Sequence, residues 1–495
     1  MVFTAIYALA RLQASPADLL RAAARKELGV IEDNQTWVMR GTSNFYGATQ
    51  SFQFIFDNKS NWLQTATGPI SMEEGDNGTM VWTRGLSGVP HEEFRHEKEI
   101  SRIRAFVVNG EWTNPDGRVE ILDLQDGRTC NLRLKGGNAM VKMTFDPVTF
   151  QAQQLSNWSP DGDETWTFSQ WTRMNNLHIP KKWVHVQGGE TDTITVSEVR
   201  LQRSYRPGYG MPKPLAGTGS FDVKAPREVK VMRRFGYVFV RPLINGQDLG
   251  WFFLDTGADL LVLDPTIIAK FKMQTVGKAP VAGVVASQSY DFVKGIDFEL
   301  GGIKLNKPIG IGLDLQPFAK ALNMPIVGIC GYDVFCRSVI TIPAKGDTIR
   351  IDPPVPMAEA KGVEMEFHGN APALECEFEG GRKAWFTLDT GSGSTVDFFS
   401  PLVASAKLLE GRKTSRIMSG GAGGSAESFA GPLEYFVLGP KRFEKTQAGF
   451  QVVKKGGFSS PWVGGNVGAG FLGKFDMTYD YANRRLNFGI PASSN

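Results

Sequence analysis

The sequence predicts a mainly β protein in which a broad antiparallel sheet precedes a duplicated, two-lobed unit. Three observations support this fold class: short runs of alternating apolar residues, an Asp-Thr-Gly tripeptide at both 255–257 and 389–391, and a Pro/Gly-rich stretch ahead of the repeats. At 495 residues the chain is too long for a single core. A net charge of +3 without a basic cluster argues against nucleic acid as the main partner.

Residues 1–14 resemble the remnant of a secretory signal peptide. An apolar run over 2–10 is followed by Arg11 and by small residues, although a leading basic segment is missing. A plain helix is the alternative. We expect export to a bacterial periplasm or secretion, with a cytoplasmic location not excluded. The sequence has no stretch of about 18 apolar residues, so no transmembrane helix is expected.

Residues 15–203 form the first expected domain. Ser15, Pro16 and Gly29 are typical of the start and end of a short N-terminal helix. Alternating strands follow, such as 51–56 and 141–145, separated by turn residues. Eight of the eleven tryptophans lie between 37 and 183, which indicates a half-open antiparallel sheet with large aromatic side chains on one face.

Residues 204–225 are expected to be a linker because proline and glycine are too dense there for a regular element. The rest of the chain is β-rich and repeats itself, which predicts one lobe over 226–355 and a second over 356–495. A glycine follows the first Asp-Thr-Gly aspartate by 76 residues and the second by 79 residues. So long a period predicts two lobes rather than a solenoid.

The two tripeptides have a chemical interpretation as a pair. If the turns face each other, Asp255 and Asp389 come within hydrogen-bond distance and share one proton, because two adjacent charges of like sign are costly. The ionised aspartate activates a water while the protonated aspartate donates to a substrate carbonyl. Threonine offers a hydroxyl that ties one turn to the other, and glycine allows a close approach of the backbone. The expected supporting residues are Thr256, Gly257, Thr390 and Gly391.

Residues 226–491 resemble the aspartic peptidases, and most closely the bacterial retropepsin-like aspartyl protease family. Asp255-Thr256-Gly257-Ala258 and Asp389-Thr390-Gly391-Ser392 match the motif of that family, which implies two retropepsin-like β-barrel lobes. The family also has two apolar residues followed by glycine beneath the active site. Ile329-Cys330-Gly331 fits this second signature, whereas Asn466-Val467-Gly468 has asparagine in place of the first apolar residue. The resemblance gives Gly331 and Gly468 a supporting role.

The family covers its cleft with a β-hairpin flap that is often rich in glycine. The segment 419–425 resembles such a flap, and a surface loop without function is the alternative. A phosphate loop is excluded because no Gly-Lys-Ser/Thr follows. The equivalent stretch 282–290 of the first lobe lacks a glycine cluster, which predicts unequal contributions from the two lobes. The flap candidates are Gly420, Gly421, Gly423 and Gly424.

Residues 30–203 resemble the half-barrels of periplasmic lipoprotein carriers. The similarity is one of pattern, and it is carried by 168–171 and 177–181. It implies an antiparallel β half-barrel that binds an apolar ligand or an envelope partner, or that serves as a structural module.

Other chemistry has little support in the sequence. The five histidines show no ligand spacing, so neither a metal nor a cofactor is expected. The sequence contains no Gly-x-Ser-x-Gly elbow, so a serine nucleophile is unsupported. The four cysteines, Cys130, Cys330, Cys336 and Cys376, are expected to be buried free thiols.

The sequence therefore predicts an aspartic-type endopeptidase that hydrolyses peptide or protein substrates at one active site formed within a single chain. The alternative is a ligand- or peptide-binding protein of the periplasm or cell envelope that retains the fold without catalysis. A third arrangement pairs each aspartate with its counterpart in another copy of the chain. The substrate depends on side chains of the cleft that spacing alone does not reveal.

Overall fold

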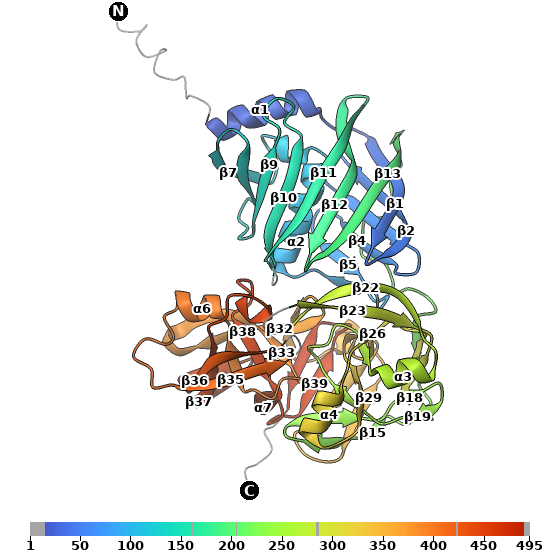
Figure 1. The fold of residues 1–495 in the computed structure, drawn as a ribbon, viewed down its shortest axis with the longest axis vertical. Coiled ribbons are helices and arrows are strands. Elements are labelled where there is room, and N and C mark those ends of the chain that lie inside the picture. The colour runs from blue at the N-terminus through green and yellow to red at the C-terminus, as the bar shows by residue number, and fades with distance from the viewer. Residues whose placement is uncertain (1–14, 160–161, 204, 284–286, 422–423, 490–495) are drawn as a thin grey trace, which may run out of the picture.

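The computed structural model describes residues 15–159, 162–203, 205–283, 287–421 and 424–489, and its fold is mainly β (Figure 1). The expected signal-peptide remnant over 1–14 and the flap candidate Gly423 lie outside the described residues. Within them, no helix has the length and apolar character needed to cross a bilayer.

The N-terminal part of the chain is a single thirteen-stranded antiparallel sheet. Its strand order is β6-β5-β4-β3-β2-β1-β13-β12-β11-β10-β9-β8-β7. The two end strands, β6 and β7, do not pair with each other, so the described part of the sheet is open rather than a closed barrel. The strands are β1 (Gln35–Phe45), β2 (Ala48–Asp57), β3 (Trp62–Thr67), β4 (Met72–Asp76), β5 (Val81–Arg84), β6 (His91–Glu92), β7 (Val119–Gln125), β8 (Thr129–Leu134), β9 (Met140–Phe145), β10 (Ala152–Ser159), β11 (Gly162–Met174), β12 (Leu177–Gln187) and β13 (Glu190–Arg203).

Two helices pack against this sheet. Helix α1 (Pro16–Leu28) begins with a capping box between Ser15 and Asp18, as the sequence indicates. Helix α2 (Arg95–Val108) buries Ile103 and Phe106 in the core that the curved sheet surrounds (Figure 1). The same core holds the side chains that the tryptophan distribution pointed to, including the fully buried Trp37, Trp62, Trp112 and Trp183.

The segment expected to be a linker runs along the edge of this domain and is held by hydrogen bonds. The indole N–H of Trp82 donates to the carbonyl of Tyr209 (2.8 Å), and the Leu215 N–H donates to the carbonyl of Gly88 (2.8 Å). The segment then enters strand β14 (Gly219–Phe221). This short strand forms because it pairs with the edge of strand β25. The local composition of the segment gives no sign of that pairing.

Two eight-stranded sheets follow, and they have the same topology. The first has the order β16-β17-β20-β27-β21-β26-β23-β22 and the second β31-β32-β33-β38-β34-β37-β36-β35. In both, the strand before Asp-Thr-Gly pairs in parallel with the strand that carries the second signature. The first comprises β16 (Met232–Arg234), β17 (Tyr237–Val240), β20 (Trp251–Leu254), β21 (Leu261–Leu263), β22 (Gln274–Ala282), β23 (Ser287–Lys294), β26 (Gly310–Gly312) and β27 (Ile326–Cys330). The second comprises β31 (Glu366–His368), β32 (Ala371–Phe378), β33 (Arg382–Asp389), β34 (Val396–Phe398), β35 (Ser415–Gly421), β36 (Gly424–Leu438), β37 (Lys441–Gln451) and β38 (Gly465–Gly468).

The two lobes are joined by a six-stranded sheet of order β15-β29-β28-β39-β40-β30. Its centre is the antiparallel pair β28–β39, in which one strand comes from each lobe. A five-stranded sheet, β14-β25-β24-β18-β19, completes the first lobe. These strands are β14, β15 (Glu228–Lys230), β18 (Leu243–Ile244), β19 (Gln247–Asp248), β24 (Asp297–Leu300), β25 (Ile303–Asn306), β28 (Val339–Ile342), β29 (Thr348–Asp352), β30 (Val363–Glu364), β39 (Met477–Asp480) and β40 (Arg485–Phe488).

Short helices and buried cysteines complete the lobes. All four cysteines are free and buried, which confirms the expectation from the sequence. Burial raises the pKa of the Cys130 and Cys336 thiols to about 12, so neither is a reactive thiolate at neutral pH. The helices are α3 (Pro265–Lys270), α4 (Gln316–Leu322), α5 (Tyr332–Phe335), α6 (Ser400–Ser405) and α7 (Ala469–Leu472).

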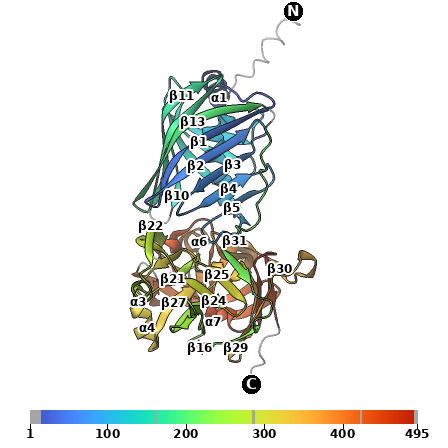
Figure 2. The same ribbon diagram turned by 90° about the vertical axis from the view of Figure 1, so that its right-hand side faces the viewer.

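The N-terminal sheet lies against both lobes, above the hairpin β22–β23 in the view of Figure 2. One apolar cluster unites Ala48 and Ile70 with Phe292 and Ile311 of the first lobe. A second unites Phe94 with Phe399 and Val463 of the second lobe. The three parts of the chain therefore share buried apolar surface rather than being connected by a tether alone.

Candidate active site

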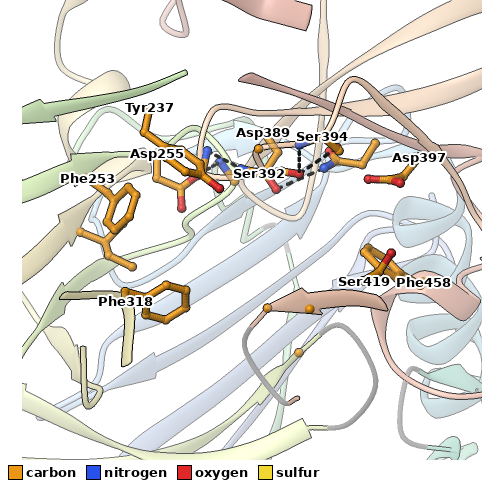
Figure 3. Close-up of a pocket in the computed structure, with 18 of the residues that line it drawn as sticks. Tyr237, Phe253, Asp255, Phe318, Asp389, Ser392, Ser394, Asp397, Ser419 and Phe458 are labelled. Carbon is orange, nitrogen blue, oxygen red and sulfur yellow. Dashed lines mark hydrogen bonds between the residues drawn. The ribbon is translucent and has the colours of Figure 1, made fainter. Parts of the chain in front are cut away.

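Asp255 and Asp389 lie side by side between the two lobes. Asp255 directly follows β20, and Asp389 is the last residue of β33, so a rigid strand holds each of them. The N–H of Gly391 lies 3.2 Å from Asp255 Oδ1 and 2.8 Å from Asp389 Oδ1. The two carboxyl groups are close enough for each to influence the pKa of the other. Both point into the same cleft in Figure 3.

The threonine of each turn forms the same pair of hydrogen bonds with the turn of the other lobe. The Thr256 hydroxyl donates to the carbonyl of Leu388 (2.7 Å), and the Thr390 hydroxyl donates to the carbonyl of Leu254 (2.8 Å). Each hydroxyl also accepts the backbone N–H of the other threonine at 3.0 Å. These four bonds are buried, and they fix the separation of the two aspartates.

The glycines lie where no side chain fits. A Cβ on Gly257 would lie 2.7 Å from Asp389 Cγ, and one on Gly391 would lie 2.4 Å from Asp255 Cγ. Gly331 and Gly468 pack beneath the turns, where a Cβ would meet a backbone oxygen at 2.2 Å and 2.4 Å respectively. Because glycine has no side chain, the two motifs can approach each other closely.

Burial and mutual charge set the protonation of the aspartates. Loss of solvent raises the pKa of Asp255 well above its ordinary value, and the negative charge of Asp389 adds to that rise. Burial also raises the pKa of Asp389, but hydrogen bonds from Asp255, the Gly391 N–H, Asn466 and the Ser392 N–H oppose the rise. The arrangement therefore favours a proton on Asp255 and a charge on Asp389.

Asn466 is a source of this asymmetry. Its amide Nδ2 donates to Asp389 Oδ2 (3.2 Å), and its Oδ1 accepts from the Thr387 hydroxyl (2.9 Å), which fixes the amide orientation. The topologically equivalent residue of the first lobe is Ile329, which offers Asp255 no donor. The sequence marked Asn466 only as a departure from the apolar pattern, and its contact with the aspartate emerges from the structure.

Two further polar residues at the site were not singled out from the sequence. Asp397 on β34 lines the cleft, is 7% exposed, and accepts a hydrogen bond from Gln451 (3.3 Å); burial raises its pKa. Tyr237 lies beside Asp255 in Figure 3, and burial together with the charge of Asp389 raises its pKa. Neither residue belongs to a recognisable motif, so only tertiary proximity reveals it.

The aspartates form the floor of a cleft of about 530 Å³. Phe253 and Phe318 form part of one wall, while Ser419 and Phe458 stand on the other side, beyond Asp397 (Figure 3). The further apolar residues that line the cleft are Leu313, Ile329, Ile417 and Met418. Such a cleft suits an extended chain with apolar side chains and one polar centre.

Each lobe contributes a β-hairpin to the cleft. In the second lobe, β35 and β36 place Gly420 and Gly421 at the cleft, and Gly424 pairs with Gly421 at the turn. In the first lobe, β22 and β23 form the equivalent hairpin in the same place in the strand order, although it has no glycine cluster. Its Gly283 also lines the cleft, and its carbonyl accepts the N–H of Gly457 (2.9 Å).

Three solved structures are each similar to a part of the chain. No protein-family model and no curated protein matches it. A solved LolA superfamily protein from Nitrosomonas europaea aligns at 14% identity over 38% of this chain and 93% of its own, with a TM-score of 0.27. A DUF1329 family protein from Desulfovibrio piger aligns at 14% identity over 39% and 95%, with a TM-score of 0.27. A retropepsin-like aspartic protease from Rickettsia conorii aligns at 16% identity over 23% and 77%, with a TM-score of 0.18.

Proposed function

We propose that the protein is an aspartic-type endopeptidase whose single active site is formed by Asp255 and Asp389 of one chain. The observation that carries the proposal is the shared environment of the two carboxyl groups, which accept the same Gly391 N–H at the floor of a cleft of about 530 Å³. The reciprocal threonine bonds between the turns support it, because they preorganise this geometry.

The unequal surroundings of the aspartates assign their roles within the proposal. Asp389, which has more hydrogen-bond donors, is the base that removes a proton from water as the water oxygen adds to the peptide carbonyl carbon. Asp255 gives its proton to the carbonyl oxygen. When the C–N bond of the resulting diol breaks, the leaving amine takes the proton held by Asp389, and a diol hydroxyl returns one to Asp255. No covalent intermediate forms.

The proposed substrate is a peptide or a segment of protein in extended conformation. The apolar walls on either side of the dyad favour apolar side chains flanking the cleaved bond. Gly283, directly after β22, and residues 417–421 of β35 line the cleft, and β35 is an edge strand to which an extended chain can add.

The proposal is tested by peptide cleavage with a library of apolar-rich peptides from pH 3 to pH 8. We expect Asp255→Asn and Asp389→Asn each to lower kcat/KM by about 100-fold or more, because general acid–base catalysis contributes about that much. Asp248→Asn, which changes an exposed aspartate on β19, is the matched control and is expected to behave as wild type. Full activity in either dyad variant would refute the one-site mechanism. If mixing the two inactive variants restored activity, the site would instead be shared between two chains.

The alternative is a binding protein that carries a ligand in its N-terminal sheet without cleaving peptides. A cavity of about 150 Å³ lies inside that sheet, but Glu74, Arg104, Glu164 and His185 line it. Arg104 and Glu74 form an ion pair, as do His185 and Glu164. Phe45, Met72 and Trp166 also line the cavity, so its mixed lining suits a ligand with both polar and apolar groups. Extraction of a stoichiometric lipid from the purified full chain, together with no cleavage of any peptide, would favour the alternative.

The location of the protein stays a prediction, since it depends on residues 1–14. Fractionation of cells that express the full chain, with detection in the periplasmic or extracellular fraction, is the expected result.

A further inference from the structure

Three side chains with metal-binding groups meet where the N-terminal domain contacts the second lobe. His96 and Glu97 lie in the first turn of α2, and His368 is the last residue of β31. One ligand atom from each of the three lies within 4.8 Å of the others. His96 is 8% exposed, and the other two are half-buried. None of the three side chains lines the cleft that holds Asp255 and Asp389, and only the fold brings the cluster together.

The two imidazoles have no hydrogen-bond partner within the part of the chain that the structure describes. His96 instead stacks on the indole of Trp462, with ring centroids 4.4 Å apart, and both imidazoles contact the edge or face of Phe94. A ring nitrogen of each imidazole is therefore available to a ligand or to solvent.

Two backbone N–H groups, one from each side of the contact, fix the orientation of the Glu97 carboxylate. Its Oε2 accepts the N–H of Phe94 (3.1 Å), and its Oε1 accepts the N–H of Gly369 (2.8 Å), the residue that follows His368. One carboxylate therefore sets the position of α2 and of the β31 end together. Each oxygen keeps a second lone pair, since an ionised carboxylate has about four acceptor sites.

We propose that His96, Glu97 and His368 form a zinc site that links the N-terminal domain to the second lobe. Two neutral imidazoles and one carboxylate suit Zn²⁺, whereas Ca²⁺ and Mg²⁺ prefer oxygen ligands. Tetrahedral bonds of about 2.0–2.1 Å place ligand atoms about 3.4 Å apart, so atoms that lie within 4.8 Å of one another must approach by up to about 1.4 Å to close the site. Three protein ligands leave a fourth position for water.

The site goes beyond the proposed peptidase activity, and no step of that mechanism involves it. Its expected effect is on the attachment of the N-terminal domain, because the ligands come from α2 on one side and from β31 on the other. An ion that binds only the docked arrangement raises the melting temperature in proportion to the logarithm of its concentration.

The test is a Zn²⁺ titration of the full chain without a histidine tag, after treatment with a chelator, against a competing coloured indicator. We expect one tight site per chain. His96→Phe keeps the stacked ring without the nitrogens, and His368→Phe does the same on β31; each is expected to weaken binding by at least tenfold. His178→Phe, which removes a histidine at the far end of the sheet, is the matched control and should bind as wild type.

Two further measurements keep the test decisive if one of these variants does not fold. Glu97→Gln retains an amide oxygen for the helix cap and is expected to weaken Zn²⁺ binding at least tenfold. Wild-type protein with Co²⁺ should show the visible absorption typical of a four-coordinate site, which Mg²⁺ at the same concentration should leave unaltered. Absence of stoichiometric Zn²⁺ binding in wild type, or equal affinity in wild type and the folded variants, would overturn the proposal.

Discussion

At the residue scale, the two aspartates of the dyad differ because of one amide. Asn466 donates to Asp389, while Ile329 occupies the equivalent place beside Asp255. Donors to an ionised carboxylate stabilise the charged form and lower its pKa. The two copies of the motif therefore differ chemically: the Asp255 carboxyl is suited to hold the proton, and the Asp389 carboxyl is suited to lose it.

We predict that Asn466→Ile moves the acidic limb of the kcat/KM–pH profile to higher pH. Loss of the amide donor raises the pKa of Asp389, so a higher pH is needed to ionise the base, by about half a pH unit or more. Profiles measured on the same peptide check this. Ile329→Val, at the equivalent position, is the control and should leave the limb in place. An acidic limb identical to that of wild type in Asn466→Ile would contradict the assigned roles.

The dyad also predicts a dependence of stability on pH. The pKa of Asp255 is raised in the folded state, so its contribution to stability is present below about the ordinary value of 3.8 and is lost as pH rises through the folded pKa. Asparagine carries no charge at any pH. We therefore expect Asp255→Asn to melt at a higher temperature than wild type at pH 7, with the difference vanishing near pH 3.5.

Calorimetric or spectroscopic melting curves at several pH values measure this difference. Asp248→Asn on β19 again provides the control. A lower melting temperature of Asp255→Asn than of wild type at pH 7 would show that the Asp255 carboxyl does not destabilise the folded state.

The sequence predicted the dyad and its threonines because their chemistry is carried by a local tripeptide that occurs twice. Asp397, Tyr237 and the role of Asn466 were not predicted. Each reaches the cleft from a strand that is distant in the chain, and a single polar residue in an apolar strand has no local pattern that indicates where it points.

At the scale of elements, the two cleft hairpins are anchored differently. The β22–β23 hairpin packs against the N-terminal sheet: the N–H of Lys278 donates to the carbonyl of Tyr46 (2.7 Å), and the Tyr46 ring meets Phe292 edge-on at 5.3 Å. The β35–β36 hairpin instead pairs within its own lobe, and its exposed tip carries the glycines. The composition of 282–290 predicted unequal lobes, but not that the N-terminal domain contacts one hairpin.

We predict that Tyr46→Ala raises KM for peptide substrates about threefold to tenfold while changing kcat less. Removal of the ring takes apolar contact from the hairpin but leaves the dyad untouched. Steady-state kinetics give the two constants, and amide hydrogen exchange over 287–294 should become faster. Tyr205→Ala, which removes a 42% exposed ring from the segment that follows β13, is the control. Unaltered exchange and KM in Tyr46→Ala would show that the hairpin does not depend on this contact.

At the scale of the whole molecule, the N-terminal domain and the lobes are held together by polar bonds as well as apolar clusters. Arg484 pairs with Glu92 at 2.6 Å, and His91 hydrogen-bonds Asn370 at 3.0 Å. The buried guanidinium of Arg337 donates to the carbonyl of Ser87. Separating the parts would break these bonds and expose the apolar side chains of the two clusters that the parts share.

We therefore predict that residues 216–489, which include β14, are less stable alone than within 15–489. The expected signs are a melting temperature lower by at least about 5 °C, increased binding of a hydrophobic dye, and cleavage activity below about a tenth of the longer chain. Melting curves, dye fluorescence and kinetics on both proteins check this. Equal stability and activity of the two would show that the interface adds little to the fold of the lobes.

The sequence by itself determined the mainly β character, the repeated motif and the chemistry that two facing aspartates make available. These follow from local patterns: alternation of apolar residues, turn residues and a tripeptide. The tertiary structure decided which aspartate has the additional donor, that the N-terminal domain packs on one hairpin, and that His96, Glu97 and His368 meet at the contact between parts. Those features depend on pairs of residues more than 75 positions apart, and sequence spacing carries no information about such contacts until strands are paired and lobes are packed.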